Sequence, residues 1–237
     1  MNLAVFGANG PTGRHVVEQA LAAGHRVTAV TRRPDQYPLS SPHLTLAVAD
    51  VTDPAGVDRV LHGLGTGPRA VISTYGVPYS RHPITVYSEG AAIITRAMAS
   101  HGIQRLVCVT STTVAAEQVP GETLMWRKVV IPLLRRVLGR TLYDDMARME
   151  DIVTSSDLDW LIVRPAGLFD ADSPSNDYQV SAQRSPGRRT SRPDLAQVLL
   201  NEATQPQHSR CAIEVLTRAI PPRQAAAFLK EAFGGRR

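Results

Sequence analysis

The first thirteen residues constrain the fold more than any other part of the chain. An apolar run at residues 3–6 leads directly into Gly7-Ala8-Asn9-Gly10-Pro11-Thr12-Gly13, which opens a helical pattern. In such a G-x-x-G-x-x-G turn, the first glycine permits a tight bend, the second leaves room for a pyrophosphate, and the third lets helix and strand pack closely. The helix N-terminus then stabilises the phosphate charge. We expect a dinucleotide site here, and the alternative is a glycine-rich turn without a ligand. The candidate cofactor-binding residues of the turn are Gly7, Asn9, Gly10, Pro11, Thr12 and Gly13.

Apolar runs alternate with helical patterns along the rest of the chain. The strand-like runs lie at residues 27–30, 44–48, 70–73, 106–109, 161–163 and 212–216. Helical faces are formed by Val16, Val17, Ala20 and Leu21, by Ile93, Ile94, Ala97 and Met98, and by Met146, Met149, Ile152 and Val153. This alternation predicts an α/β fold, Rossmann-like and doubly wound, with a mainly parallel sheet and helices on both faces. Continuous apolar runs are typical of strands buried on both faces.

We expect residues 1–237 to form a single NAD(P)-binding domain, because no segment resembles a domain linker. Two stretches interrupt the alternation. Residues 114–142 hold the basic amphipathic run 126–138, which we expect to be a lid or a dimer helix rather than a nucleic-acid or membrane surface. Residues 169–192 are rich in Ser, Asp, Pro and Arg and are expected to form a flexible loop. Both follow strands, near the carboxyl edge where open α/β sheets bind ligands.

The composition narrows the class of partner. The net charge is +5, and all basic residues except Lys128 and Lys230 are arginines. Such a balance suits nucleic acid, a membrane surface or an anionic small molecule. The phosphate-binding turn favours a small-molecule partner, and we expect no nucleic acid and no membrane. The two cysteines, Cys108 and Cys211, exclude a disulfide scaffold and a cysteine-based zinc site and suit a reducing cytosol. We expect a cytoplasmic monomer or homodimer without a metal.

The end of the second strand indicates which dinucleotide binds. An NAD site usually has an acid there to hold the ribose 2′-hydroxyl, whereas this chain has Thr31 followed by Arg32 and Arg33. Guanidinium groups suit a 2′-phosphate in charge and geometry, so we expect NADP(H), with a solvated basic loop as the alternative. Asp50 and Val51, after the third strand, are expected to bind the adenine amino group and cover the ring.

The alternative role for Asp50 is to cap a helix ahead of Pro54. Asp53 is the better candidate for capping the helix that starts at Pro54. The fourth strand ends in Thr74, Tyr75 and Gly76, where a glycine again lets the backbone approach the cofactor.

Taken together, these residues resemble the atypical short-chain dehydrogenase/reductases with NAD(P)H-binding Rossmann domains, and among them the NADPH-dependent flavin reductases, also called biliverdin-IXβ reductases. Beyond the glycine turn, the likeness rests on Val86-Tyr87-Ser88-Glu89-Gly90 with Ala97-Met98 and His101-Gly102, on Val109-Thr110-Ser111, on residues 144–149 with Ser156-Asp157-Leu158, and on Ser191-Arg192-Pro193-Asp194-Leu195. It covers roughly residues 1–218. The resemblance implies that Thr110, Pro165 and Ala166 lie beside the nicotinamide.

The chain departs from that family in two places. It carries extra residues within 114–142, and it has Glu150 where the flavin reductases have a basic residue or histidine. Arg184, Arg188, Arg189 and Arg192 form a basic cluster that either lines the acceptor site or is solvated. The resemblance therefore does not fix the acceptor.

The available chemistry is direct hydride transfer. No tyrosine is followed by a lysine four residues later, so the usual proton-donating dyad of short-chain dehydrogenases is absent. A flavin, tetrapyrrole or quinone-like acceptor can take its proton from water. Ser111 is the candidate catalytic residue, with a local backbone cap as the alternative role of its hydroxyl. Tyr79, His82 and Tyr143 are weaker candidates, and Arg164 is expected either to be structural, paired with a carboxylate such as Glu150, or to serve the site.

The sequence thus predicts an NADPH-dependent oxidoreductase acting on a planar acceptor. The alternative is a regulatory protein that senses NADP(H) without turnover.

Overall fold

The computed structural model describes residues 1–80, 82–115, 140–183, 187 and 189–218. The amphipathic run at residues 126–138 and the arginines at 184 and 188 lie outside them. The strands are β1 (Asn2–Phe6), β2 (Arg26–Thr31), β3 (Leu44–Val48), β4 (Arg69–Ser73), β5 (Arg105–Val109), β6 (Asp159–Pro165), β7 (Gly167–Phe169), β8 (Tyr178–Ser181), β9 (Arg189–Ser191) and β10 (Cys211–Thr217). The helices are α1 (Pro11–Ala22), the short 3₁₀ helix η1 (Pro34–Gln36), α2 (Pro54–His62), α3 (Val86–Ser100), α5 (Arg140–Thr154) and α6 (Arg192–Thr204).

An eight-stranded sheet organises the described residues. Its strand order is β3-β2-β1-β4-β5-β6-β10-β8, and β7 pairs with β9 in a second, two-stranded sheet. All pairings in the large sheet are parallel except that of β8 with β10. Each strand predicted from the sequence is present within two residues at either end.

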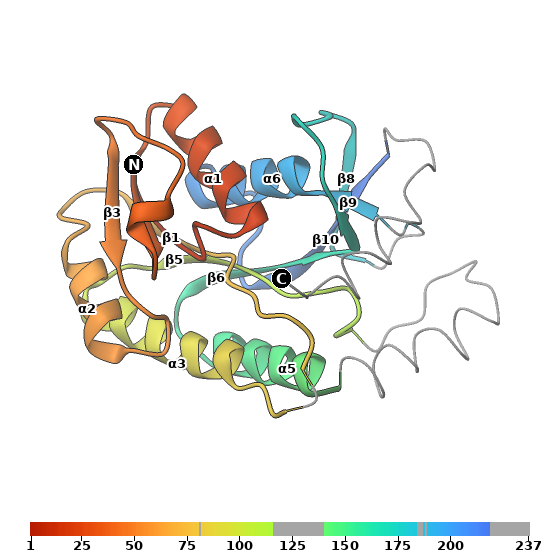
Figure 1. Cartoon of the computed structure of the whole chain (residues 1–237). Helices are drawn as coiled ribbons and strands as arrows, with labels where there is room; N and C mark the ends of the chain where they lie inside the picture. Colours follow the sequence, from red (N-terminus) through yellow and green to blue (C-terminus); the bar gives the residue numbers. More distant parts are fainter. Residues whose placement is uncertain (81, 116–139, 184–186, 188, 219–237) are drawn as a thin grey trace.

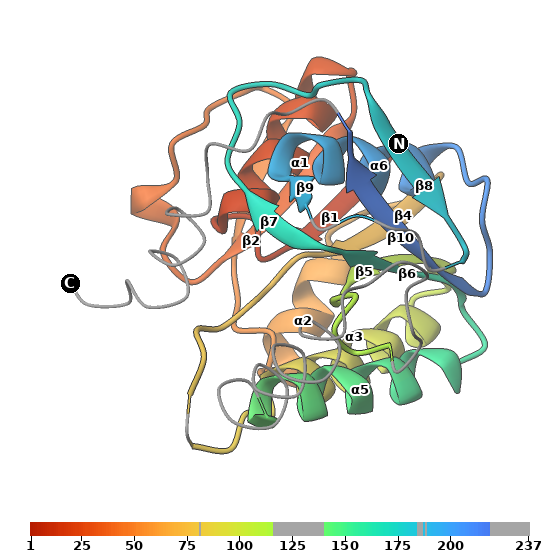
Figure 2. The same ribbon diagram turned by 90° about the vertical axis from the view of Figure 1, so that its right-hand side faces the viewer.

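Helices cover both faces of the sheet (Figures 1 and 2). Helices α1 and α6 pack together on one face, and α2, α3 and α5 pack on the other. The predicted helical faces point into these two layers. Val16, Val17 and Ala20 are buried with Leu195 on the first side, whereas Ile94, Met98, Met149 and Val153 are buried on the second. This arrangement confirms the doubly wound Rossmann-like fold.

Two helices begin at side-chain caps that the sequence indicates. The Asp53 carboxylate accepts a hydrogen bond from the Ala55 backbone N–H at 3.1 Å and caps α2, as predicted. The Ser191 hydroxyl accepts from the Asp194 backbone N–H at 3.1 Å and caps α6. These caps fix where the chain leaves the strand edge and turns into a helix.

The structure differs from the sequence prediction at both edges of the sheet. Strand β3 was expected to be buried on both faces, but it is the edge strand, and its side chains Leu46 and Val48 are 38% and 61% exposed. Within residues 169–192, expected to form a flexible loop, the structure places β8 and β9 as well as the end of β7. Strand β8 forms because it pairs with β10, a partner about thirty residues away that local composition does not reveal.

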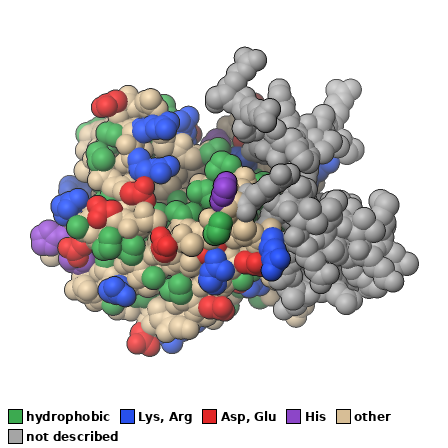
Figure 3. Space-filling model, turned by 60° about the horizontal axis from the view of Figure 1, so that its bottom comes forward, with side chains coloured by type: hydrophobic (Ala, Val, Ile, Leu, Met, Phe, Trp, Pro, Cys, Tyr) green, Lys and Arg blue, Asp and Glu red, His purple; other side chains and the backbone are tan. Residues whose placement is uncertain are grey.

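On the face that carries α2, α3 and α5, acidic, basic and apolar side chains are interspersed (Figure 3). No helix in the described part of the chain is long and apolar enough to span a membrane.

Candidate functional site

The candidate site lies at the carboxyl edge of the sheet, where the strand order reverses. Strands β1 and β4 are neighbours, but β1 continues into α1 on one face and β4 leads to α3 on the other (Figure 1). The chain diverges above these two strands, and such a switch point is where doubly wound folds hold dinucleotides. All predicted cofactor residues follow strand ends at this edge or open the helix behind it.

The three glycines of the turn have different structural roles. Gly7 has a φ of +77°, and a Cβ on it would lie 2.4 Å from the backbone nitrogen of Tyr75. A Cβ on Gly13 would lie 2.2 Å from the Gly7 carbonyl oxygen, so α1 packs directly on the turn. A Cβ on Gly10 would meet only that carbonyl oxygen, at 3.2 Å. Gly7 and Gly13 are therefore required by the fold, whereas Gly10 leaves open space in front of the helix.

Helix α1, which follows the glycine turn, has no acidic side chain in its first turn. Gly10 is the N-cap residue of α1, Pro11 is the first helical residue, and the first turn holds no acid. Thr12 is buried. The Asn9 side-chain oxygen accepts two hydrogen bonds from the Arg14 guanidinium, at 3.1 and 2.8 Å. Arg14 was not singled out by sequence reasoning, although its place directly after the third glycine is visible in the sequence.

The end of β2 presents the predicted arginines. The Thr31 hydroxyl accepts a hydrogen bond from the Arg33 backbone N–H at 3.1 Å and is buried. Arg32 is exposed, and its guanidinium lies 3.4 Å from the Asp50 carboxylate. Hydrogen bonds from the Thr52 backbone and hydroxyl, together with the charge of Arg32, lower the pKa of Asp50. Asp50 therefore stays ionised and holds Arg32 beside the predicted cofactor position.

The end of β4 lies on the other side of β1 from the end of β2. The Thr74 hydroxyl donates to the Phe6 carbonyl at 3.0 Å and ties β4 to β1. The Tyr75 side chain turns into the protein, and its hydroxyl donates to the Tyr87 carbonyl at 3.0 Å. A Cβ on Gly76 would meet only the Tyr87 hydroxyl, at 3.4 Å. Thus the ring of Tyr75 is structural and its backbone lies against Gly7, whereas the space beside Gly76 is nearly unobstructed.

Helix α3 approaches this edge closely. A Cβ on Gly90 would lie 2.8 Å from both the Tyr75 hydroxyl oxygen and a methyl carbon of Val51. Val51 thus packs against α3 and forms the wall beside the predicted adenine position.

The ends of β5 and β6 meet over a buried ionic network. Arg164 forms a bidentate pair with Glu150, at 3.0 and 2.5 Å, as the sequence suggested. The Thr110 hydroxyl donates to the same carboxylate at 2.7 Å. Next to it, the Ser111 hydroxyl oxygen accepts from the Thr113 backbone N–H at 3.2 Å. The local cap considered for Ser111 is therefore present, yet its own proton is still available to a ligand.

The backbone of β6 is held in place by its neighbours. The Pro165 carbonyl accepts from the Thr112 backbone N–H at 3.1 Å. The Ala166 backbone N–H donates to the Thr190 hydroxyl at 3.0 Å. These bonds fix the strand ends on either side of Ser111.

The weaker candidates lie on the loop between β4 and α3 and at the start of α5. The Tyr79 and Tyr143 hydroxyls are 2.8 Å apart, and burial raises the pKa of Tyr79. His82 is exposed on the same loop. The Tyr79 hydroxyl therefore stays protonated and serves as a donor and not as a base.

The sequence does not predict the structural roles of two residues here. Asp145 is fully buried in α5, and its carboxylate accepts from the backbone N–H groups of Tyr87 and Ser88 at the start of α3. Arg192, placed by sequence in a basic cluster, is instead buried and forms an ion pair with Asp170 at 3.0 Å. Both contacts join elements far apart in the chain, which leaves no local signal.

The residues present fit a dinucleotide. The turn is open at Gly10, the helix behind it lacks a first-turn acid, and arginines stand at the end of β2. These features match the space and the charge that a pyrophosphate and a 2′-phosphate require. When bound, a nicotinamide would supply the hydride, and Ser111 would hold its amide or the acceptor. Among the described residues no group of three or more His, Cys, Asp or Glu side chains is placed to hold a metal.

Comparisons with known proteins agree with this geometry. An uncharacterized chloroplastic protein of Arabidopsis thaliana is 28% identical over 228 residues, which span 93% of this chain and 78% of that protein. ChuY of Escherichia coli O157:H7, described as an anaerobillin reductase, has a TM-score of 0.72 at 22% identity, with 94% of this chain and 100% of that chain covered. A short-chain dehydrogenase/reductase of Veillonella parvula in complex with NADP has a TM-score of 0.73 at 14% identity, covering 92% and 95% of the two chains.

The family assignment rests on a match along most of the sequence. Residues 7–206 match the family described as NAD(P)H-binding, which spans the glycine turn, the ends of β2 to β6 and helix α6. The expected NAD(P)H-binding Rossmann domain is thereby confirmed, and the chain belongs to the NAD(P)H-binding family.

Proposed function

We propose that this protein is an NADPH-dependent reductase that transfers hydride to a flavin, tetrapyrrole or quinone-like acceptor. The observation that carries the proposal is the presence, at one sheet edge, of a dinucleotide turn, arginines at the end of β2 and a serine at the end of β5. Thr31 stands where an acid would select NAD, and Arg32 follows it. Membership of the NAD(P)H-binding family supports the cofactor class.

The choice of a planar acceptor follows from the proton donors and bases that the chain offers near the site. The sequence lacks the tyrosine–lysine dyad, and the contact that the described residues make with the Ser111 hydroxyl is a backbone N–H, not a base. Hydride transfer to a conjugated ring puts the resulting charge on heteroatoms that water can protonate, so a strong protein acid is not required. A neighbour of the same fold, ChuY, is described as an anaerobillin reductase, which supports a tetrapyrrole as one member of the class.

The free cysteines Cys108 and Cys211 suit a reducing compartment, and we propose the cytosol.

The test is NADPH oxidation, followed by stopped-flow and steady-state absorbance, with FMN, biliverdin and a soluble quinone. We expect turnover with at least one of the three. Tight NADPH binding without turnover on any of them would favour the regulatory alternative. Failure to bind either NADPH or NADH would remove the proposal altogether.

The cofactor preference is tested at the end of β2. In the double variant Arg32→Glu, Arg33→Ser, we expect NADPH affinity to fall at least tenfold, because each charge-assisted hydrogen bond to the 2′-phosphate is worth roughly 1.5–3 kcal/mol. NADH affinity should change little. Both are measured by titration of nucleotide fluorescence, and an unchanged NADPH affinity would contradict the assignment.

A further inference from the structure

Helix α1 places a cation where a helix is least able to accommodate one. Arg14 lies in the first turn of α1, which contains no acidic residue and no side-chain cap. The N-terminus of a helix carries partial positive charge, so a guanidinium there is repelled unless an anion lies nearby. By comparison, α3 and α6 have Glu89 and Asp194 in their first turns. The position of Arg14 thus calls for a negative partner.

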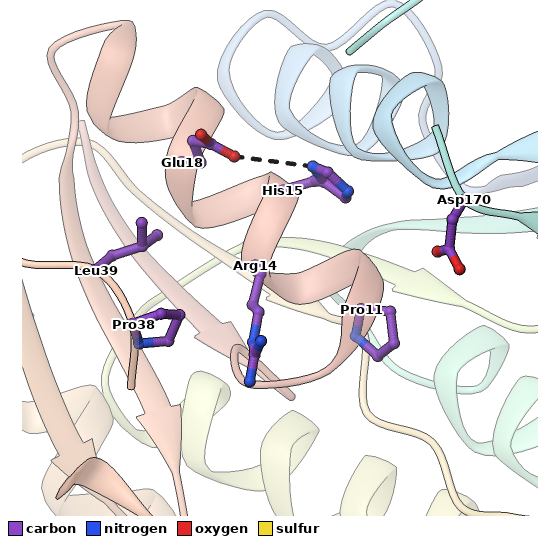
Figure 4. Close-up of a pocket in the computed structure, with 7 residues that line it drawn as sticks. All are labelled: Pro11, Arg14, His15, Glu18, Pro38, Leu39 and Asp170. Carbon is purple, nitrogen blue, oxygen red and sulfur yellow. Dashed lines mark ion pairs between the residues drawn. The ribbon is translucent and has the colours of Figure 1, made fainter. Parts of the chain in front are cut away.

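The described part of the protein does not supply that partner. The guanidinium of Arg14 donates twice to the neutral side-chain oxygen of Asn9, and no carboxylate among the described residues forms an ion pair with it. Figure 4 shows its side chain running from α1 toward the glycine turn, away from Glu18, which instead pairs with His15. Asn9 therefore holds the group in place while leaving its charge uncompensated.

The guanidinium faces the segment that follows β2. The Tyr37 hydroxyl donates to the Ala8 carbonyl at 3.4 Å, so the segment after η1 lies against the turn. Burial raises the pKa of Tyr37 to about 12, and the nearby charge of Arg14 acts in the opposite direction. An open hollow of about 330 Å³ lies beside Arg14, with Pro11 on one side and Pro38 on the other, and two carboxylates, those of Glu18 and Asp170, also line it. Glu18 pairs with His15 and Asp170 pairs with Arg192, so both carboxylates have cationic partners of their own, and a small anion can reach the Arg14 guanidinium from solvent.

We propose that Arg14 is a specificity-determining residue that binds the 2′-phosphate of NADPH, with Asn9 as its positioning residue. The inference rests on the proposed cofactor. In this fold the adenosine ribose lies between the glycine turn and the end of the second strand, and Arg14 reaches into that interval from the turn side. Arg32 approaches from the β2 side, where Asp50 already offsets part of its charge. The two arginines would thus bind the 2′-phosphate from opposite sides.

The test compares nucleotides that differ only in this phosphate. We expect Arg14→Met to weaken NADPH and 2′,5′-ADP binding about tenfold or more, and to leave NADH and ADP within about twofold. Affinities are measured by calorimetry. The matched control is Arg26→Met, which removes the same charge from the exposed start of β2 at the opposite sheet edge. It should leave all four affinities nearly unchanged.

Asn9→Ala separates positioning from direct contact. It should weaken NADPH binding less than Arg14→Met does, and it should add almost nothing in the Arg14→Met background. The apo Arg14→Met variant should melt no lower than the wild type, because it relieves repulsion at the helix end. Lower thermal stability with unchanged nucleotide selectivity would show that Arg14 is merely structural.

The outcomes distinguish this inference from the proposed function. If the wild type prefers NADPH but Arg14→Met weakens NADPH and NADH equally, Arg14 contacts the pyrophosphate and the inference is wrong. If Arg14→Met changes neither affinity, the inference is also wrong while the proposed function stands. If the wild type shows no preference for NADPH over NADH, the proposed cofactor itself fails.

Discussion

Ser111 has one observed structural contact, and we propose a chemical role for the same hydroxyl. Its oxygen accepts from the Thr113 backbone N–H, which leaves its proton able to orient the nicotinamide amide or the acceptor in the proposed reaction. We expect Ser111→Ala to slow hydride transfer only about two- to tenfold, the loss of one neutral hydrogen bond. Stopped-flow absorbance with a flavin acceptor measures this rate. A drop above about a thousandfold, with NADPH affinity intact, would instead show acid catalysis by the serine.

Which residues of the site are predictable depends on how local their contacts are. The glycine turn, the arginines after β2 and the pairing of Arg164 with Glu150 follow from position along the chain and from charge. The inward turn of Tyr75 and the role of Asp145 do not, because each depends on a partner in another crossover. Side-chain direction at a strand end is set by packing that a single sequence does not encode locally.

In the strand–turn–helix unit at the N-terminus, one glycine serves cofactor binding and another serves folding. Gly10 has a φ of −73°, and a side chain there meets only one backbone atom, so Gly10→Val should fold normally and lose NADPH binding. Gly13→Ala should destabilise the protein by several kcal/mol, since its Cβ would overlap the Gly7 carbonyl. Urea denaturation and nucleotide titration of both variants test this contrast. A Gly10→Val protein that binds NADPH like the wild type would exclude a pyrophosphate at the turn.

Helix α3 depends on a cap supplied by another helix. Thr85 precedes α3 without a side-chain cap, and the Asp145 carboxylate of α5 accepts from the Tyr87 and Ser88 backbone instead. Asp145→Ala should lower the free energy of unfolding by about 1–3 kcal/mol, because buried donors lose their partner. The control is Asp144→Ala, which removes an exposed surface pair and should cost less than about 0.5 kcal/mol. Equal effects in denaturant titrations would contradict the capping role.

At the level of the whole molecule, alternating apolar and helical patterns suffice for the fold class but not for the sheet edges. The strand at each edge has a neighbour on one side only, so its burial depends on what the rest of the chain leaves uncovered. That is why β3 is more exposed than its apolar sequence suggests, and why β8 was expected as loop. Central strands are predictable because both of their faces are buried, and both therefore require apolar side chains.

The core offers a reporter of global unfolding. Cys108 is buried in β5, and burial raises the pKa of its thiol, so the reactive thiolate is suppressed in the native state. Cys211, at the start of β10, is partly exposed. We expect iodoacetamide to label Cys108 only at urea concentrations that unfold the sheet, and Cys211 at lower ones. Mass spectrometry of the labelled peptides measures both, and rapid native labelling of Cys108 would show that the central strands open locally.

The position of β10 has a consequence for synthesis on the ribosome. Among the described strands of the sheet, β10 comes last in the sequence, yet it lies between β6 and β8. Until residues 211–217 emerge from the exit tunnel, β6 has an unpaired edge and β8 has no strand to pair with. The nascent chain therefore presents an apolar, unpaired strand edge to chaperones from the completion of β6 at residue 165 until β10 emerges, although its dinucleotide turn is complete after the first thirteen residues.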